Sequence, residues 1–154
     1  MKKPHTDLPD DMQGDRGEGH PLGRLILELR RLERNPRHYG GIGPLTPTEI
    51  HTIDAIGREE GILMSELAAR LGITKGAASQ MIGRLEAKAL VRRTPHPGDS
   101  RSVIVSLEEQ GKVAHKAHEE LHRSFYNHLR SELGAEGIRT FEEGVEKFIA
   151  FLRK

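Results

Sequence analysis

The fold is decided by residues 65–112, which read SELAARLGITKGAASQMIGRLEAKALVRRTPHPGDSRSVIVSLEEQGK. Helical spacing of apolar residues predicts a short helix over 66–71, with Ser65 as its cap, and a longer one from Thr74 to about Ala89. Gly72 separates the two helices and permits a sharp angle between their axes. The stretch therefore predicts a helix-turn-helix.

A β-hairpin is expected directly after the second helix. Strand candidates cover 90–93 and 102–106, and Val103 and Val105 share one face of the second strand. Two prolines and a glycine between the strands are typical of a hairpin tip. A helix-turn-helix followed by such a hairpin, or wing, predicts a mainly α fold with a small β-wing.

The same region carries a charge imbalance that the whole chain hides. The formal net charge of the 154 residues is +1, whereas residues 70–101 contain only two acidic residues, Glu86 and Asp99. The basic residues of this range are Arg70, Lys75, Arg84, Lys88, Arg92, Arg93 and Arg101. A local positive excess is typical of a surface that binds a polyanion, although a solvated basic face has the same composition.

Side chains on the second helix and the wing suit recognition of double-stranded DNA. In the major groove a glutamine pairs with adenine, an arginine with guanine or phosphate, and a serine with either base. Arginines on a wing reach phosphates or the minor groove. The residues predicted to contact DNA are Thr74, Lys75, Ser79, Gln80, Arg84, Arg92, Arg93 and Arg101.

The segments before this region predict a leader, two helices and a loop. Residues 1–21 are rich in proline, glycine and acidic side chains, which is typical of a flexible leader. Leucines at helical spacing predict a helix over 22–34, and residues 40–47 are expected to form a loop. Thr46 and Glu49 have the spacing of a capping box that opens the next helix.

Two helices are expected after the wing. Ser106 and Glu109 form a second candidate capping box, which would open a long helix from Leu107 to about Leu133. Gly134 breaks the pattern, and apolar residues on one face predict a last helix over 135–152.

Composition argues against several other classes of protein. The chain has no cysteine, which excludes disulfides, thiolate metal sites and cysteine nucleophiles. Its apolar stretches are shorter than the roughly 20 residues that span a bilayer, and no secretory signal follows Met1, so a cytoplasmic protein without a membrane partner is expected. Hydrophobic residues make up 35% of the chain, and so thin a core favours an oligomer.

Several motifs in the deciding stretch resemble the MarR family of regulators. The second helix ends in LEAKALVRR over 85–93, the wing carries DSR over 99–101, and LEEQG over 107–111 opens the following helix. The family pattern has glycine in place of Ala89 and threonine in place of Glu108, so the departures are small. The resemblance covers the chain after its leader.

The resemblance implies an intertwined homodimer. Helices within 22–44 and 108–154 would interlock between two subunits, and residues 45–107 would form the DNA-binding lobe. The two lobes would bind a pseudo-palindromic operator. Asp99 would hold Arg101 at the wing tip for the minor groove.

Nine histidines are a high count for a chain of 154 residues. His115, His118 and His122 occur at helical spacing and form one stripe of the long helix after the wing. His118 and His122 make a His-x-x-x-His pair, which is good zinc geometry when further ligands come from elsewhere. His51 and Glu33 are candidates for those ligands, although histidines beside a helical core are often hydrogen-bonded without a metal.

The chain is also similar to the zinc-responsive members of the MarR family, and this resemblance implies a ligand set. Those members bind zinc through a glutamate near the end of the first helix, a histidine of the second helix and a His-x-x-x-His pair after the wing. The matching positions are Glu33, His51, His118 and His122, with Glu28 and His38 as substitutes for Glu33. A second site in those proteins uses a cysteine, which this chain lacks; His38, Tyr39 and His115 leave another arrangement open.

The resemblance implies a repressor of metal-uptake genes whose operator affinity depends on bound zinc. The metal would tie the first two helices to the helix that leaves the wing. Manganese, cobalt and nickel accept the same ligands. The alternative is a regulator that senses a small aromatic or lipophilic acid, with the histidines as polar groups of its pocket. An enzyme is not expected, because the sequence has no phosphate loop and no recognisable nucleophile–base pair.

Overall fold

The structure, a computed structural model, describes residues 20–154 apart from the side chain of Glu33. The leader expected over 1–21 lies almost entirely outside the described residues. The elements, in chain order, are α1 (Pro21–Glu33), β1 (Arg37–Tyr39), β2 (Ile42–Leu45), α2 (Pro47–Ile56), β3 (Ile62–Leu63), α3 (Met64–Leu71), α4 (Lys75–Ala87), β4 (Val91–His96), β5 (Asp99–Leu107) and α5 (Glu109–Leu152).

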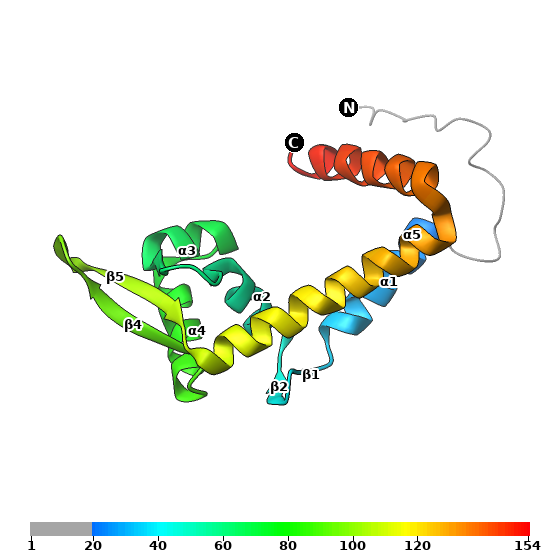
Figure 1. The fold of residues 1–154 in the computed structure, drawn as a ribbon. Helices are drawn as coiled ribbons and strands as arrows, with labels where there is room; N and C mark the ends of the chain where they lie inside the picture. The colour runs from blue at the N-terminus through cyan, green and yellow to red at the C-terminus, as the bar shows by residue number, and fades with distance from the viewer. Residues whose placement is uncertain (1–19) are drawn as a thin grey trace, which may run out of the picture.

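The predicted winged helix-turn-helix is confirmed. α3 ends at Gly72, whose φ of 65° lies in the left-handed region that glycine adopts at little cost. α4 then begins behind Thr74, whose hydroxyl accepts a hydrogen bond from the N–H of Ala77. β4 and β5 pair antiparallel as the wing, and β5 also pairs with the short strand β3, which the sequence did not predict. α3, α4 and the wing form one lobe, from which α5 leads away (Figure 1).

Two predicted helix caps are wrong. α3 begins at Met64, so Ser65 lies inside its first turn and no side chain caps the helix. α5 begins behind Glu108, again without a side-chain cap. The Ser106 hydroxyl instead donates to the carbonyl of Glu60 at 3.3 Å. A long-range contact has therefore replaced the local hydrogen bond that the sequence pattern suggested.

The chain between α1 and α2 forms a hairpin where a loop was expected. β1 and β2 pair antiparallel around Gly40 and Gly41, both of which have positive φ values. Tyr39 and Leu45 of this hairpin are buried in the core. A Gly-Gly pair between two short segments is a hairpin signal that the loop interpretation missed.

The capping box predicted at the start of α2 is confirmed. The Glu49 N–H donates to the Thr46 hydroxyl at 3.2 Å, and the Thr46 N–H donates to the Glu49 carboxylate at 3.0 Å. Lys88, just after α4, donates to both oxygens of the same carboxylate at 2.8 Å. Glu49 therefore joins the start of α2 to the end of α4.

The hydrophobic core lies in the winged lobe and extends to the first half of α5. Its fully buried large side chains include Ile50 and Ile53 of α2, Leu67 of α3, Ile82 and Leu85 of α4, and Val105 of β5. Ala114 of α5 is also fully buried. The core therefore fixes α4, the wing and the start of α5 as one packed unit.

α5 bends sharply at Gly134, as the sequence predicted. Gly134 has a φ of 73°, outside the helical region, and residues 135–152 turn back from the first half of the helix (Figure 1). Exposed apolar side chains lie on α1 and along α5, among them Leu22, Leu25, Ile26, Leu29, Leu133, Phe141, Val145 and Phe148. Such faces are typical of helices that interlock in a dimer. In the described part of the chain no helix is both long and apolar enough to cross a membrane.

Candidate nucleic-acid interface and histidine pocket

α4 has one buried face and one exposed polar face beside the wing. Ala78, Ile82 and Leu85 hold the buried face in the core. The predicted contact residues on the exposed face are Thr74, Lys75, Gln80 and Arg84. An exposed helix face with hydrogen-bonding and cationic side chains is suited to the major groove of DNA.

The wing carries two exposed arginines, Arg92 in β4 and Arg101 in β5. Arg92 makes a loose ion pair at 4.0 Å with Glu108. Asp99 accepts the backbone N–H of Arg101 at 2.9 Å and the hydroxyl of Ser102 at 2.8 Å. It therefore orders the backbone at the wing tip, and the described contacts give it no bond to the Arg101 guanidinium. These two hydrogen bonds lower the pKa of Asp99.

Two other predicted DNA contacts, Ser79 and Arg93, are engaged with each other. Both side chains are only partly exposed, and the Arg93 guanidinium donates to the Ser79 hydroxyl at 2.9 Å. They line a cleft of about 330 Å³ between α4 and the wing, together with Lys75 and Arg101. The structure thus brings the predicted residues onto one surface but assigns these two an internal contact.

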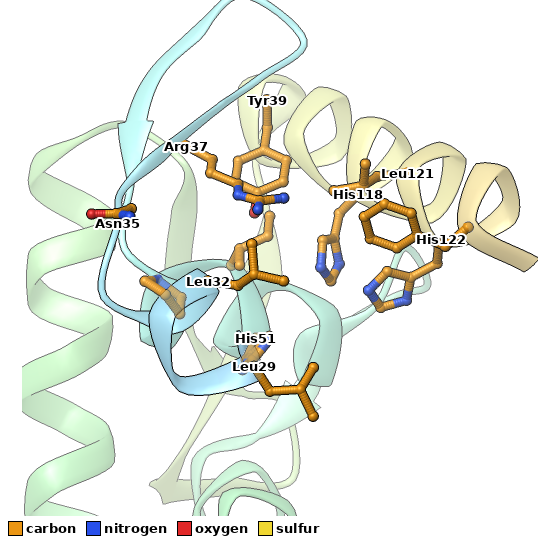
Figure 2. Close-up of a pocket in the computed structure, with 12 residues that line it drawn as sticks. Leu29, Leu32, Asn35, Arg37, Tyr39, His51, His118, Leu121 and His122 are labelled. Atoms are coloured by element: carbon orange, nitrogen blue, oxygen red, sulfur yellow. The ribbon is translucent and has the colours of Figure 1, made fainter. Parts of the chain in front are cut away.

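A second cavity, of about 350 Å³, lies between α1, β1, α2 and α5 (Figure 2). Its apolar wall comes from Leu29 and Leu32 of α1 and from Leu121 and Phe125 of α5. The polar groups that line it are Asn35, Arg37, Tyr39, His51, His118 and His122. We call this cavity the histidine pocket.

Three of the four predicted metal ligands meet in the histidine pocket. His118 and His122 point into it from α5, and His51 reaches it from α2 (Figure 2). The ring centroids of His118 and His122 are 4.1 Å apart, and those of His51 and His118 are 6.0 Å apart. The side chain of Glu33 lies outside the described part of the chain.

As they stand, these side chains do not form a metal site. Among the described side chains, which do not include that of Glu33, no group of three or more histidine, aspartate or glutamate side chains is placed to hold a metal ion. The two substitutes for Glu33 do not line the pocket. Glu28 pairs with Arg31 at 3.4 Å, and His38 is exposed on β1.

Asp54 of α2 is a partner of His118 that sequence reasoning missed. Its carboxylate lies 2.5 Å from Nδ1 of His118. Because a carboxylate only accepts, Nδ1 carries the proton, and in the neutral ring Nε2 is left as an acceptor. Burial lowers the pKa of His118. The neighbouring His122 and His51 also lower it, whereas Asp54 raises it. The three-residue spacing between His51 and Asp54 was the available signal, because it places both on neighbouring positions of α2.

A chain of polar contacts leads from Asp54 away from the pocket. Its second carboxylate oxygen is buried without a hydrogen-bond partner among the described residues and lies 3.9 Å from Nε2 of His115. Arg58, in the loop after α2, donates to Nδ1 of His115 at 3.3 Å and to Glu119 at 2.6 Å. His115 therefore belongs to this network and does not line the histidine pocket.

Comparisons with known proteins agree with this geometry. Residues 44–102 match the family model described as MarR family. The chain is 28% identical over 131 residues to the multiple antibiotic resistance protein MarR of Salmonella typhimurium, covering 84% of this chain and 91% of that protein. The segment that matches the family model contains α2, α3, α4 and most of the wing.

Solved structures show the same fold. A MarR variant from E. coli complexed with operator DNA superposes with a TM-score of 0.62 at 28% identity, covering 83% of this chain and 93% of that one. Streptococcus pneumoniae FabT in complex with DNA gives a TM-score of 0.75 at 24% identity, covering 86% of this chain and 92% of that one. The FabT likeness shows the fold alone, whereas the MarR likeness extends to sequence.

Proposed function

We propose that the chain is a DNA-binding transcriptional regulator of the MarR type, and that it represses its target genes by binding a pseudo-palindromic operator as a homodimer under the control of a small effector. Its relatives are regulators, and it is not an enzyme. The observation that carries the proposal is the exposed face of α4, with Lys75, Gln80 and Arg84 beside the exposed wing arginines.

Operator binding is tested by selecting a bound sequence from random DNA and then measuring affinity for it over a salt series. We expect Gln80→Ala and Arg84→Ala each to cost about 1–3 kcal/mol and to relax specificity at one base position. Lys116 is an exposed cation on α5 outside the lobe. Lys116→Gln is therefore the matched control and should change neither the operator affinity nor the base specificity. The proposed interface would be contradicted if the protein selected no DNA sequence, or if the two variants were as specific as the wild type.

The histidine pocket is the effector site we propose. It is built from α1, α2 and α5, and α5 continues directly from β5 of the wing. A ligand that prefers one arrangement of these helices would shift the spacing of the two α4 helices in a dimer. By linkage, operator DNA would change the affinity for that ligand by the same factor.

A divalent metal, zinc in the first place, is the effector that the sequence favours. Imidazole nitrogens suit zinc, and Nε2 of His118 is free to accept because Asp54 holds Nδ1. The set is incomplete as the side chains stand, so His51 would have to turn toward the α5 pair and Glu33 or another group would have to complete it.

The metal proposal is tested on protein purified without a histidine tag. We expect stoichiometric zinc binding, an operator affinity that changes about 5- to 150-fold between zinc and chelator, and loss of both in His118→Ala. His128→Ala, an exposed histidine on the same helix, is the control. Absence of zinc binding in the wild type would refute the proposal of metal control but not the proposal of operator binding.

A second candidate effector is a small aromatic or lipophilic acid. The observation that favours it is the apolar wall of Leu29, Leu32, Leu121 and Phe125, which shares one cavity with the guanidinium-bearing residue Arg37. A guanidinium pairs readily with a carboxylate. This effector is supported if an aromatic acid releases the operator in the presence of chelator and if Arg37→Met weakens that release. It is not supported if Arg37→Met leaves the release unchanged.

A further inference from the structure

The geometry points to Arg93 as a positioning residue that clamps the wing to the recognition helix, and not as a residue that contacts DNA. This inference rests on the proposed operator binding. It reassigns two residues, Arg93 and Ser79, that their residue types and their location predict to be DNA contacts.

Each of the three nitrogens of the Arg93 guanidinium donates to a residue of α4. Its Nε donates to a carboxylate oxygen of Glu86 at 2.6 Å. One terminal nitrogen donates to the Ser79 hydroxyl at 2.9 Å, and the other donates to the Ser79 carbonyl at 2.7 Å. All three nitrogens are therefore used, and Glu86 neutralises the positive charge that a phosphate would otherwise attract.

The sequence of α4 provides the surface on which this guanidinium lies. Ser79, Gly83 and Glu86 are spaced by four and three residues, so they share one face of the helix. A Cβ built on Gly83 would lie 3.5 Å from a terminal nitrogen of Arg93. This is an ordinary van der Waals distance, so the guanidinium lies directly against this face of α4.

Strand alternation separates Arg93 from its neighbour Arg92. Successive side chains of a strand point to opposite faces, and in β4 the Arg93 side chain is 31% exposed whereas that of Arg92 is 59% exposed. Arg92 has only the loose 4.0 Å pair with Glu108 among the described contacts. Arg92 is therefore the cation that faces outward, and Arg93 joins β4 to α4.

The clamp sets the angle between two DNA-reading parts. α4 presents Lys75 and Gln80, and the wing presents Arg101 beyond the clamp. If the wing swings relative to α4, the two parts cannot meet the major groove and the adjacent backbone at the same time. Arg93 then determines operator affinity without touching DNA, as preorganisation does at other interfaces.

The salt dependence of operator binding distinguishes a clamp from a phosphate contact. Removing one phosphate contact flattens the plot of log affinity against log salt by about 0.9, and a substitution in a dimer removes two such contacts. Arg92→Gln should therefore flatten the slope by about 2, whereas Arg93→Gln should weaken operator binding about tenfold with an unchanged slope. A slope that falls in Arg93→Gln as it does in Arg92→Gln would overturn the clamp.

Glu86→Gln gives a test of opposite sign that keeps the arginine in place. If Arg93 contacted phosphate, removing the acidic partner would release the cation and strengthen binding. The clamp predicts weaker operator binding, by about three- to tenfold, because the 2.6 Å anchor loses its charge. Unchanged or tighter binding would contradict it.

Two measurements guard against trivial explanations. Thermal unfolding checks that each variant is folded, and Glu86→Gln, which keeps the arginine, serves in place of Arg93→Gln if the latter does not fold. Binding to non-operator DNA should be unaffected in both variants, because phosphate contacts remain. If the wild type itself neither selects nor binds an operator, the proposed function fails, and not the clamp alone.

Discussion

At the scale of single residues, the carboxylate of Asp99 orders the wing tip through two hydrogen bonds, from the Arg101 N–H and the Ser102 hydroxyl. Both bonds favour the charged form and lower the pKa of Asp99 below its ordinary value. The stabilising contribution of a carboxylate with a lowered pKa is present above its unfolded pKa and is lost as the pH falls through its folded pKa. Order at the wing tip is therefore lost only in acid.

We expect the Asp99 carboxyl to titrate below about 3.9, the value of an unperturbed aspartate, when it is followed by NMR. Ser102→Ala should raise the midpoint part of the way, because the Arg101 N–H still donates. Ser100→Ala, a neighbour that makes no hydrogen bond to Asp99 among the described contacts, should leave it unchanged. A midpoint at or above the unperturbed value would contradict the observed turn.

The sequence identified residues by type and place but not by partner. Lys75, Gln80, Arg84 and Arg101 are exposed where the helix and hairpin patterns put them. Arg93 has the same type and a neighbouring place, yet its contact with Glu86 joins a strand to the helix that precedes it. A contact between a strand and a helix leaves no periodic trace in a sequence, and for that reason the role of Arg93 needed the structure.

At the scale of elements, the first turn of α5 depends on a glycine. The backbone of Gly111 passes so close to the start of β4 that an added Cβ would clash with the Leu90 carbonyl oxygen. That same oxygen accepts the N–H of Glu108 at 2.9 Å. The junction between the wing and α5 is therefore closed by backbone contact, and α5 and the wing move together.

We expect Gly111→Ala to lower the free energy of unfolding by about 1–3 kcal/mol, the usual cost of overpacking a core, as measured by denaturant titration. Gly76→Ala is the matched control, because Gly76 also lies in the first turn of a helix and an added Cβ meets nothing within 4 Å. The control should be neutral or stabilising by up to about 1 kcal/mol. Equal stability of the two variants would argue against the close approach.

Elements with strong periodicity were predicted well, and those with weak or competing signals were not. α1 and α4 follow from apolar spacing, and the break at Gly134 follows from its residue type. β1 and β2 are too short for alternation to show. Ser106 has the spacing of a cap, but its hydroxyl had a competing acceptor in the carbonyl of Glu60.

At the scale of the whole molecule, the chain divides its apolar surface between a closed core and an open face. The core joins α2, α3, α4 and the wing, whereas the leucines of α1 and most large apolar side chains in the last part of α5 stay exposed. We expect an open apolar face of this extent to be the surface that a second subunit covers. The histidine pocket lies where the core and this face meet, so a dimer and an effector would share α1 and α5.

The final prediction tests this face with two leucines of one helix. Leu25 shares a stripe of α1 with Leu22, Ile26 and Leu29, whereas Leu27 points to the opposite side by helical geometry; both are exposed in the single chain, at 50% and 64%. Leu25→Glu would place a charge inside an apolar interface, where an unpaired charge is strongly unfavourable. We expect it to give monomers in light scattering and to weaken operator binding at least tenfold, because a monomer engages only one half-site. Leu27→Glu should remain a dimer with wild-type affinity. If Leu25→Glu stays dimeric, or if Leu27→Glu dissociates equally, the dimer uses a face of α1 other than the stripe. The histidine pocket, which Leu29 of the stripe lines, would then not lie beside the subunit interface.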